Sequence, residues 1–113
     1  MDRRYKTIEK YIDYMHINTY IYHMNYTYDQ KKRAANLKKH GYDFEDAPHV
    51  IESGHTVTFE DHRFDYDEQR FITLGVLRED VVVIVTCETE KEIRVISMRK
   101  ADKNEQKIYY SNL

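Results

Sequence analysis

The chain has few of the residues that cross-link or interrupt small proteins. Its 113 residues include one cysteine, one proline, three glycines and no tryptophan. A single cysteine excludes an intrachain disulfide, and Cys87, which follows the apolar run 81–86, is expected to be a packed thiol on a strand. Gly41, Gly54 and Gly75 stand too far apart in the sequence to form a glycine-rich phosphate loop.

Long apolar runs are absent as well. No stretch approaches the roughly 18 residues of a membrane-spanning helix, and none has the charged, apolar and small-residue order of a signal peptide. We therefore expect a cytoplasmic protein without a membrane partner. His49, His55 and His62 fall at intervals of six and seven residues, which match neither a helical ligand pair nor a zinc finger. No metal and no other cofactor is expected.

The chain does have abundant charge, and this charge is unevenly distributed. The formal net charge of -2 gives no overall attraction to nucleic acid. Residues 24–41 hold five Lys or Arg and one Asp, whereas residues 42–69 hold nine acidic residues and one Arg. This pattern predicts a bipolar surface, although a set of solvated faces on a small globular protein explains it equally well.

Helix signals dominate the first half of this single-domain chain. Asp29 is a good N-cap and Gly41 a good C′ residue, which predicts a basic helix of about three turns between them. Its apolar stripe is narrow and consists of Ala34, Ala35 and Leu37. A second, acidic helix is expected from residue 43 to residue 51, where apolar residues recur at helical spacing.

Strand signals follow, and a short aromatic edge strand at residues 25–28 precedes the first helix. Strands are expected at 56–59, 70–77, 81–86 and 93–99, with a hairpin turn at 78–80. A terminal helix begins near Asp102. The fold class is therefore α+β, with two N-terminal helices, a four-stranded mainly antiparallel sheet and a C-terminal helix, the helices being gathered on one face.

An ordered set of short motifs runs through most of the chain. The motifs are Tyr28-Asp29, Lys32-Arg33 with Asn36, Lys38-Lys39-His40-Gly41 with Phe44 and Ala47, Arg70–Gly75, and Ile93–Ala101 followed by Tyr109. In this order and spacing, from Met24 to about Tyr110, they resemble the BrnT family of bacterial ribonuclease toxins. The resemblance implies a RelE-like fold, metal-independent RNA cleavage that inhibits translation, and neutralisation by a cognate antitoxin.

Residues 1–23 lie outside this resemblance. They hold five of the eleven tyrosines, and their apolar residues at positions 5, 8, 12 and 15 follow helical spacing. Either this N-terminal extension is an additional amphipathic helix that packs on the domain or on a partner, or Met24 is the true start. We expect residues 24–113 to form the BrnT-like toxin domain.

RNA cleavage without a metal needs cations that hold the phosphate, and three arginines on expected strands are the candidates. A guanidinium group offers two parallel donors and stays charged. The resemblance places Arg70 and Arg99 first as catalytic residues. Arg94 is a candidate for binding RNA. Arg94 and Arg99 are five residues apart, so they share a face only with a bulge or at the strand end. Each arginine could instead pair across strands with Glu88, Glu90 or Glu92.

Cleavage also needs a base for the 2′-hydroxyl proton and an acid for the leaving 5′-oxygen. His40, at the C-terminal end of the basic helix, is the candidate acid, or else it only caps the helix. Glu60, with Asp61 beside it, is the candidate base and needs a flanking cation such as Arg63. The remaining candidates for binding RNA are Lys38, Lys39 and Tyr109.

One position departs from the family pattern. Thr89 stands about where an arginine is often present in the family, so activity is expected to be reduced or the phosphate to be held elsewhere. The expected partners are an RNA substrate and a ribbon-helix-helix antitoxin, with operator DNA bound only through the antitoxin complex and a homodimer within a heterotetramer as an open alternative. The alternative function is a non-catalytic RNA-binding or partner-binding module with the same fold.

Overall fold

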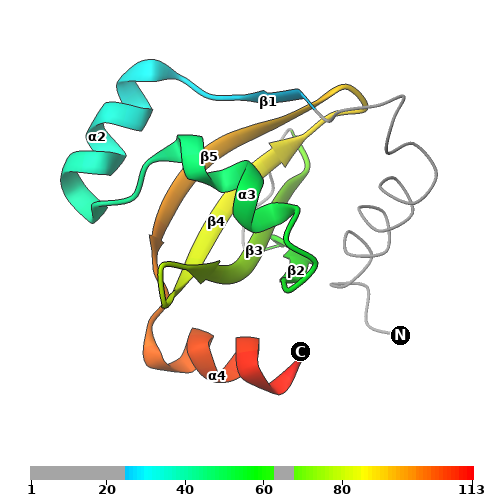
Figure 1. Ribbon diagram of the computed structural model, residues 1–113. Helices are drawn as coiled ribbons and strands as arrows, with labels where there is room; N and C mark the ends of the chain where they lie inside the picture. The colour runs from blue at the N-terminus through cyan, green and yellow to red at the C-terminus, as the bar shows by residue number, and fades with distance from the viewer. Residues whose placement is uncertain (1–24, 63–67) are drawn as a thin grey trace.

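The computed structural model describes residues 25–62 and 68–113 (Figure 1). The extension predicted at residues 1–23 and the flanking cation predicted at Arg63 lie outside these described residues.

The described part of the chain contains one five-stranded mixed sheet in the order β1-β5-β4-β3-β2. β2 (Val57–Glu60), β3 (Arg70–Leu77), β4 (Asp80–Glu88) and β5 (Glu92–Lys100) form the predicted antiparallel meander. β1 (Asn25–Thr27) pairs in parallel with the outer edge of β5. The α+β class is confirmed. The four-stranded count is wrong, because the short strand before the first helix joins the sheet as a fifth strand.

The helix α2 (Gln30–His40) has both of its predicted caps. The Asp29 carboxylate accepts hydrogen bonds from the backbone N–H groups of Lys31 and Lys32, at 2.9 and 3.1 Å. Gly41 adopts a left-handed conformation with φ 78° and closes the helix on the Leu37 carbonyl. A residue with a Cβ would be strained at this φ, which explains the glycine.

The apolar stripe predicted for α2 does not face the core. Ala34 and Ala35 are exposed, Leu37 is 44% exposed, and the buried residue of the helix is Asn36. The Asn36 carboxamide donates to the carbonyl of Met98 at 2.8 Å and accepts from its N–H at 3.2 Å. Because β1 ends before it reaches this part of β5, the side chain of Asn36 takes the place of a neighbouring strand.

The short helices η2 (Phe44–Asp46) and α3 (Ala47–Ile51) occupy the region of the predicted second helix. They bury an apolar cluster against one face of the sheet, made of Phe44, Ala47 and Val50 with Val82, Ile84, Val95 and Met98. A Cβ added at Gly75 would stand 2.5 Å from a methyl group of Val50. Glycine therefore allows α3 to lie directly on β3.

The last helix, α4 (Lys103–Ser111), begins at Asp102 as predicted, with a capping box that includes Glu105. It packs on the face opposite to α3, where Ala101 and Tyr109 join Leu74, Val81 and Val83 in a second cluster. The prediction that all helices gather on one face is therefore wrong (Figure 1). Apolar residues of β4 point to both faces of the sheet, so each face needs a helix that shields it from water.

The turn between β3 and β4 is the predicted hairpin. Arg78 and Glu79 both have positive φ, 48° and 75°. This is the backbone of a two-residue turn whose twist matches the twist of the flanking strands.

Candidate functional site

A bulge in β5 decides which arginines share a face of the sheet. Val85 of β4 pairs with Ser97, whereas the next residue, Thr86, pairs with Val95. Ile96 is thus an extra residue in β5, and it restores the parity that five intervening positions would break. Arg94 and Arg99 consequently lie on the same face of the sheet, because the bulge that this arrangement needs is present.

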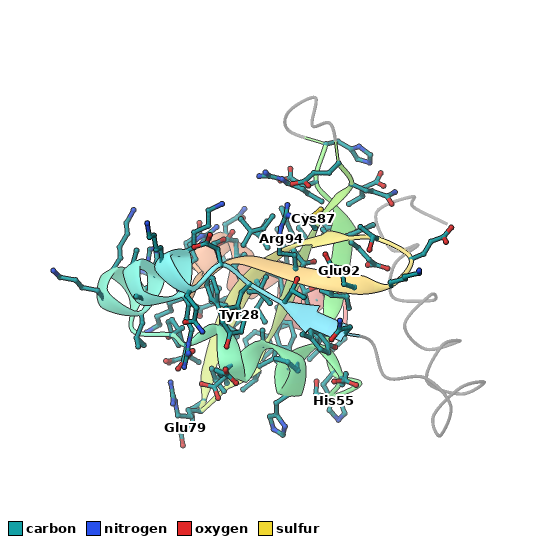
Figure 2. All side chains as sticks on the ribbon, turned by 90° about the horizontal axis from the view of Figure 1, so that it is seen from above. Tyr28, His55, Glu79, Cys87, Glu92 and Arg94 are labelled. Atoms are coloured by element: carbon teal, nitrogen blue, oxygen red, sulfur yellow. The ribbon has the colours of Figure 1, made fainter. Side chains whose placement is uncertain are left out.

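Four side chains form a transverse row across this face. Arg70 of β3 pairs with Cys87 of β4, Cys87 pairs with Arg94 of β5, and Arg94 pairs with Thr27 of β1. Residues opposite one another on paired strands point to the same side of a sheet. Figure 2 shows Cys87 and Arg94 next to each other, as their pairing requires. The apolar cluster of the same face, which includes Tyr109 of α4, begins one row further on, at Ile72.

The carboxylate of Glu68 joins the arginines of this row. Its Oε2 lies 2.8 Å from a terminal nitrogen of Arg94, and its Oε1 lies 3.3 Å from a terminal nitrogen of Arg70. The two arginines stand on strands that are separated by β4, about 10 Å apart at the backbone. Their guanidinium groups therefore converge on one anion.

Cys87 lies beneath this carboxylate and hydrogen-bonds to it. That hydrogen bond, then the charge of Arg94 and the hydrogen bonds from Arg94 and Arg70, lower the pKa of Glu68 below its usual value. Burial and the neighbouring carboxylate raise the pKa of Cys87 to about 11. The thiol is 4% exposed and keeps its proton, so it acts as a hydrogen-bond donor and a packing group, as expected for this cysteine.

A cavity of about 370 Å³ adjoins the row where β1 leads into α2. Its volume is within the range of small-molecule pockets. It lies between Arg94 and the bulge residue Ile96 on one side and the first turn of α2 on the other, where Lys32 supplies a second cation. The cavity thus continues the cationic part of the row toward α2.

Arg99 shares the face but not the row. Both of its terminal nitrogens lie 2.7 Å from the carboxylate oxygens of Glu105, in the capping box of α4. Arg99 pairs with Val83, and Val83 pairs with Leu74 of β3. Leu74 is four residues from Arg70, a distance of roughly 13 Å along the strand. The structure therefore brings Arg94, rather than Arg99, next to Arg70.

The candidate residues at the end of α2 lie away from the row. Lys38, Lys39 and His40 are in the last turn, whereas the helix approaches Arg94 with its first turn at Lys32. His40 follows Lys32 by eight positions in the helix, a distance of about 12 Å along the axis. Lys38 and Lys39 are exposed and form a cationic surface at the end of α2 that is far from the row.

Glu60 lies on the other face of the sheet. It pairs with Phe71, whose side chain points opposite to that of Arg70. It accepts a hydrogen bond from Gln69, and its Oε2 lies 2.7 Å from His62 Nε2. Asp61 is 5% exposed, and its N–H donates to the Arg70 carbonyl at 2.8 Å.

Tyr109, expected to bind RNA, is instead a core residue that attaches α4 to the sheet. It is 2% exposed, and its hydroxyl donates to the His55 carbonyl at 2.8 Å. Its ring is therefore covered and cannot stack on a base. Thr89 forms the β4–β5 turn, where its hydroxyl accepts from the N–H groups of Lys91 and Glu92.

Glu68 and Lys32 are the site residues that sequence reasoning did not assign. Glu68 stands two residues before Arg70, so the same alternation that orients Arg70 gives a signal for it. Within residues 25–62 and 68–113, no group of three His, Cys, Asp or Glu side chains is placed to hold a metal ion. None of the helices in these ranges is long and apolar enough to cross a membrane.

Comparison with known proteins agrees with the motif order. No curated protein matches the chain. The family model of the ribonuclease toxin BrnT of type II toxin-antitoxin systems matches residues 28–105, which include every strand after β1, the helices up to the start of α4, and the Arg70–Arg94 row. The chain belongs to the BrnT family of ribonuclease toxins.

Proposed function

We propose that this protein is an endoribonuclease toxin that cleaves RNA without a metal and thereby inhibits translation. The observation that carries the proposal is the convergence of Arg70 and Arg94 on one anion, at 3.3 and 2.8 Å, on the face of the sheet beyond the cluster that α4 covers. An RNA phosphate that binds on this face would meet the same two guanidinium groups, next to the carboxylate. Charge-assisted bonds from two guanidinium groups suit a phosphate that gains charge in the transition state.

RNA supplies its own nucleophile, because the 2′-hydroxyl lies next to the phosphate. The protein then needs to orient the backbone, neutralise the phosphorane and manage protons. Arg94 takes the place of the arginine that the family often has near position 89, so the phosphate is held by β3 and β5. The exposed lysines of α2, Lys32, Lys38 and Lys39, extend the cationic surface along the flanking RNA.

The partner that we propose is a cognate ribbon-helix-helix antitoxin. Its acidic side chains would pair with the cationic surface of α2 and with the arginine row, which would block the RNA site and give an electrostatically steered complex. Operator DNA would be bound only by the antitoxin part of that complex. Because translation is the target, the site of action is the cytoplasm.

The proposal is tested with the whole chain and a 5′-labelled RNA in excess chelator. We expect wild-type cleavage, a loss of at least 100-fold in Arg70→Ala and in Arg94→Ala, as is typical for one transition-state donor, and little change in the matched control Lys107→Ala. Lys107 is an exposed cation on α4. Binding of the RNA without cleavage by any form would support the alternative, a non-catalytic RNA-binding module.

A further inference from the structure

Glu68 is a carboxylate that connects several strands of the sheet. It contacts three side chains from three consecutive strands of the sheet: Arg70, Cys87 and Arg94. Because these donors are fixed by strand register, the carboxylate is oriented by the sheet itself. Its side chain is nevertheless 35% exposed, which leaves it accessible to a bound molecule.

We propose that Glu68 is the general base of the RNA cleavage reaction, a role that rests on the proposed function of this site. When Arg70 and Arg94 hold a phosphate, the adjacent 2′-hydroxyl of the RNA would lie close to the same two guanidinium groups. A carboxylate that already bonds to both groups lies within reach of that hydroxyl. Shared contacts with the arginines therefore place base and phosphate side by side.

The reaction balances without any further reactant. Glu68 takes the 2′-hydroxyl proton while the 2′-oxygen forms a bond to phosphorus, and the bond from phosphorus to the 5′-oxygen breaks. The leaving 5′-oxygen takes a proton from solvent water, and protonated Glu68 returns its proton to solvent. The products are a 2′,3′-cyclic phosphate and a 5′-hydroxyl, and no electron is transferred.

The charges around Glu68 explain how a strongly held carboxylate can act as a base. Arg70, Arg94 and Cys87 face it from β3, β5 and β4 and keep it ionised before RNA binds. A bound phosphate would share the same arginines and add a negative charge, so the pKa of Glu68 would rise in the complex. A base becomes more effective as its pKa approaches the working pH. Lys32 lines the cavity on the far side of Arg94, and Asp61 adjoins Arg70.

The other candidate bases are less well placed. Glu60 points to the opposite face, as its pairing with Phe71 requires. Asp61 is only 5% exposed, so an RNA hydroxyl cannot reach it. His40 lies about 12 Å along α2 from the turn that approaches Arg94.

The test compares single-turnover cleavage by the whole chain and by Glu68→Gln, with Glu90→Gln as the matched control. Glu90 is an exposed carboxylate in the β4–β5 turn. We expect Glu68→Gln to lose 100- to 10,000-fold in rate, the usual range for a general base, while its RNA affinity stays equal or rises. The acidic limb of the pH–rate profile should disappear. Glu68→Asp, which keeps the carboxylate on a shorter side chain, should retain part of the activity and keep that limb.

Two results would overturn the assignment while leaving the proposed function intact. Cleavage by Glu68→Gln at the wild-type rate, or faster, would make Glu68 only a competitor for the phosphate position. Loss of the acidic limb in Glu60→Gln but not in Glu68→Gln would move the base to Glu60. By contrast, a wild-type chain that cleaves no RNA would overturn both proposals together.

Discussion

Replacement of Asn36 by alanine should strongly destabilise the protein. The Asn36 carboxamide makes three hydrogen bonds in a buried setting, to the carbonyls of Tyr42 and Met98 and from the N–H of Met98. Alanine would leave three backbone groups without these partners. At about 1 kcal/mol for each net hydrogen bond, and more where a group stays buried and unpaired, we expect a loss of about 3 kcal/mol in the free energy of unfolding.

For a domain of this size, such a loss corresponds to a fall of roughly 15 °C in Tm. Thermal melts followed by circular dichroism would measure it, with Lys31→Ala, an exposed residue of the same helix, as the control. Asn36→Asp should melt at least as low at neutral pH, because a carboxylate cannot donate to the two carbonyls. A melt of Asn36→Ala within 3 °C of wild type would refute the view that this amide, rather than an apolar stripe, attaches α2 to the sheet.

Three further predictions concern the turn, the acid stability and the RNA surface. Glu79→Gly should raise the free energy of unfolding by about 1 kcal/mol in urea titrations, because φ is 75° at this position and glycine adopts it without strain; no gain would contradict this. The hydrogen bonds from Arg33 and from the backbone lower the pKa of Asp43 to about 2. Its stabilising effect is therefore complete above its usual value of 3.8 and is lost as the pH falls toward 2, so the stability of Asp43→Asn should decline less over that interval than that of wild type. Lys32→Ala should weaken RNA binding for all sequences and reduce the salt-dependence slope by about one, whereas an unchanged slope would place the RNA elsewhere.

Local signals allowed much of the fold to be predicted. The caps of α2 at Asp29 and Gly41, the start of α4 and the hairpin at Arg78 depend on residues close in sequence, and all of them were found. The position of α4 was not, because the strand β4 is apolar on both faces and either face could accept a helix. The role of Asn36 was also missed, since a polar residue that replaces a strand partner has no periodic signature.

The candidate site was only partly predictable for a related reason. Arg70 and Arg94 were named from the sequence, but their approach depends on the register of three strands and on the extra residue Ile96. Register is a property of paired strands, so it cannot be read from one segment. Glu68 acquires its contacts only when that register is set. Arg99 was ranked first from the sequence but does not join Arg70. Its partner Glu105 lies in α4 and holds Arg99 at the other end of the same face.

The most direct test of the account is a double-mutant cycle on RNA cleavage. Rates in chelator would be measured for wild type, Arg70→Ala, Arg94→Ala and the double variant, with folding checked by thermal melts. If the two arginines hold one phosphate, the wild type cleaves and the double variant loses little more than either single variant. An inactive wild type, or two losses that simply multiply, would contradict a shared phosphate site on the β3–β5 face.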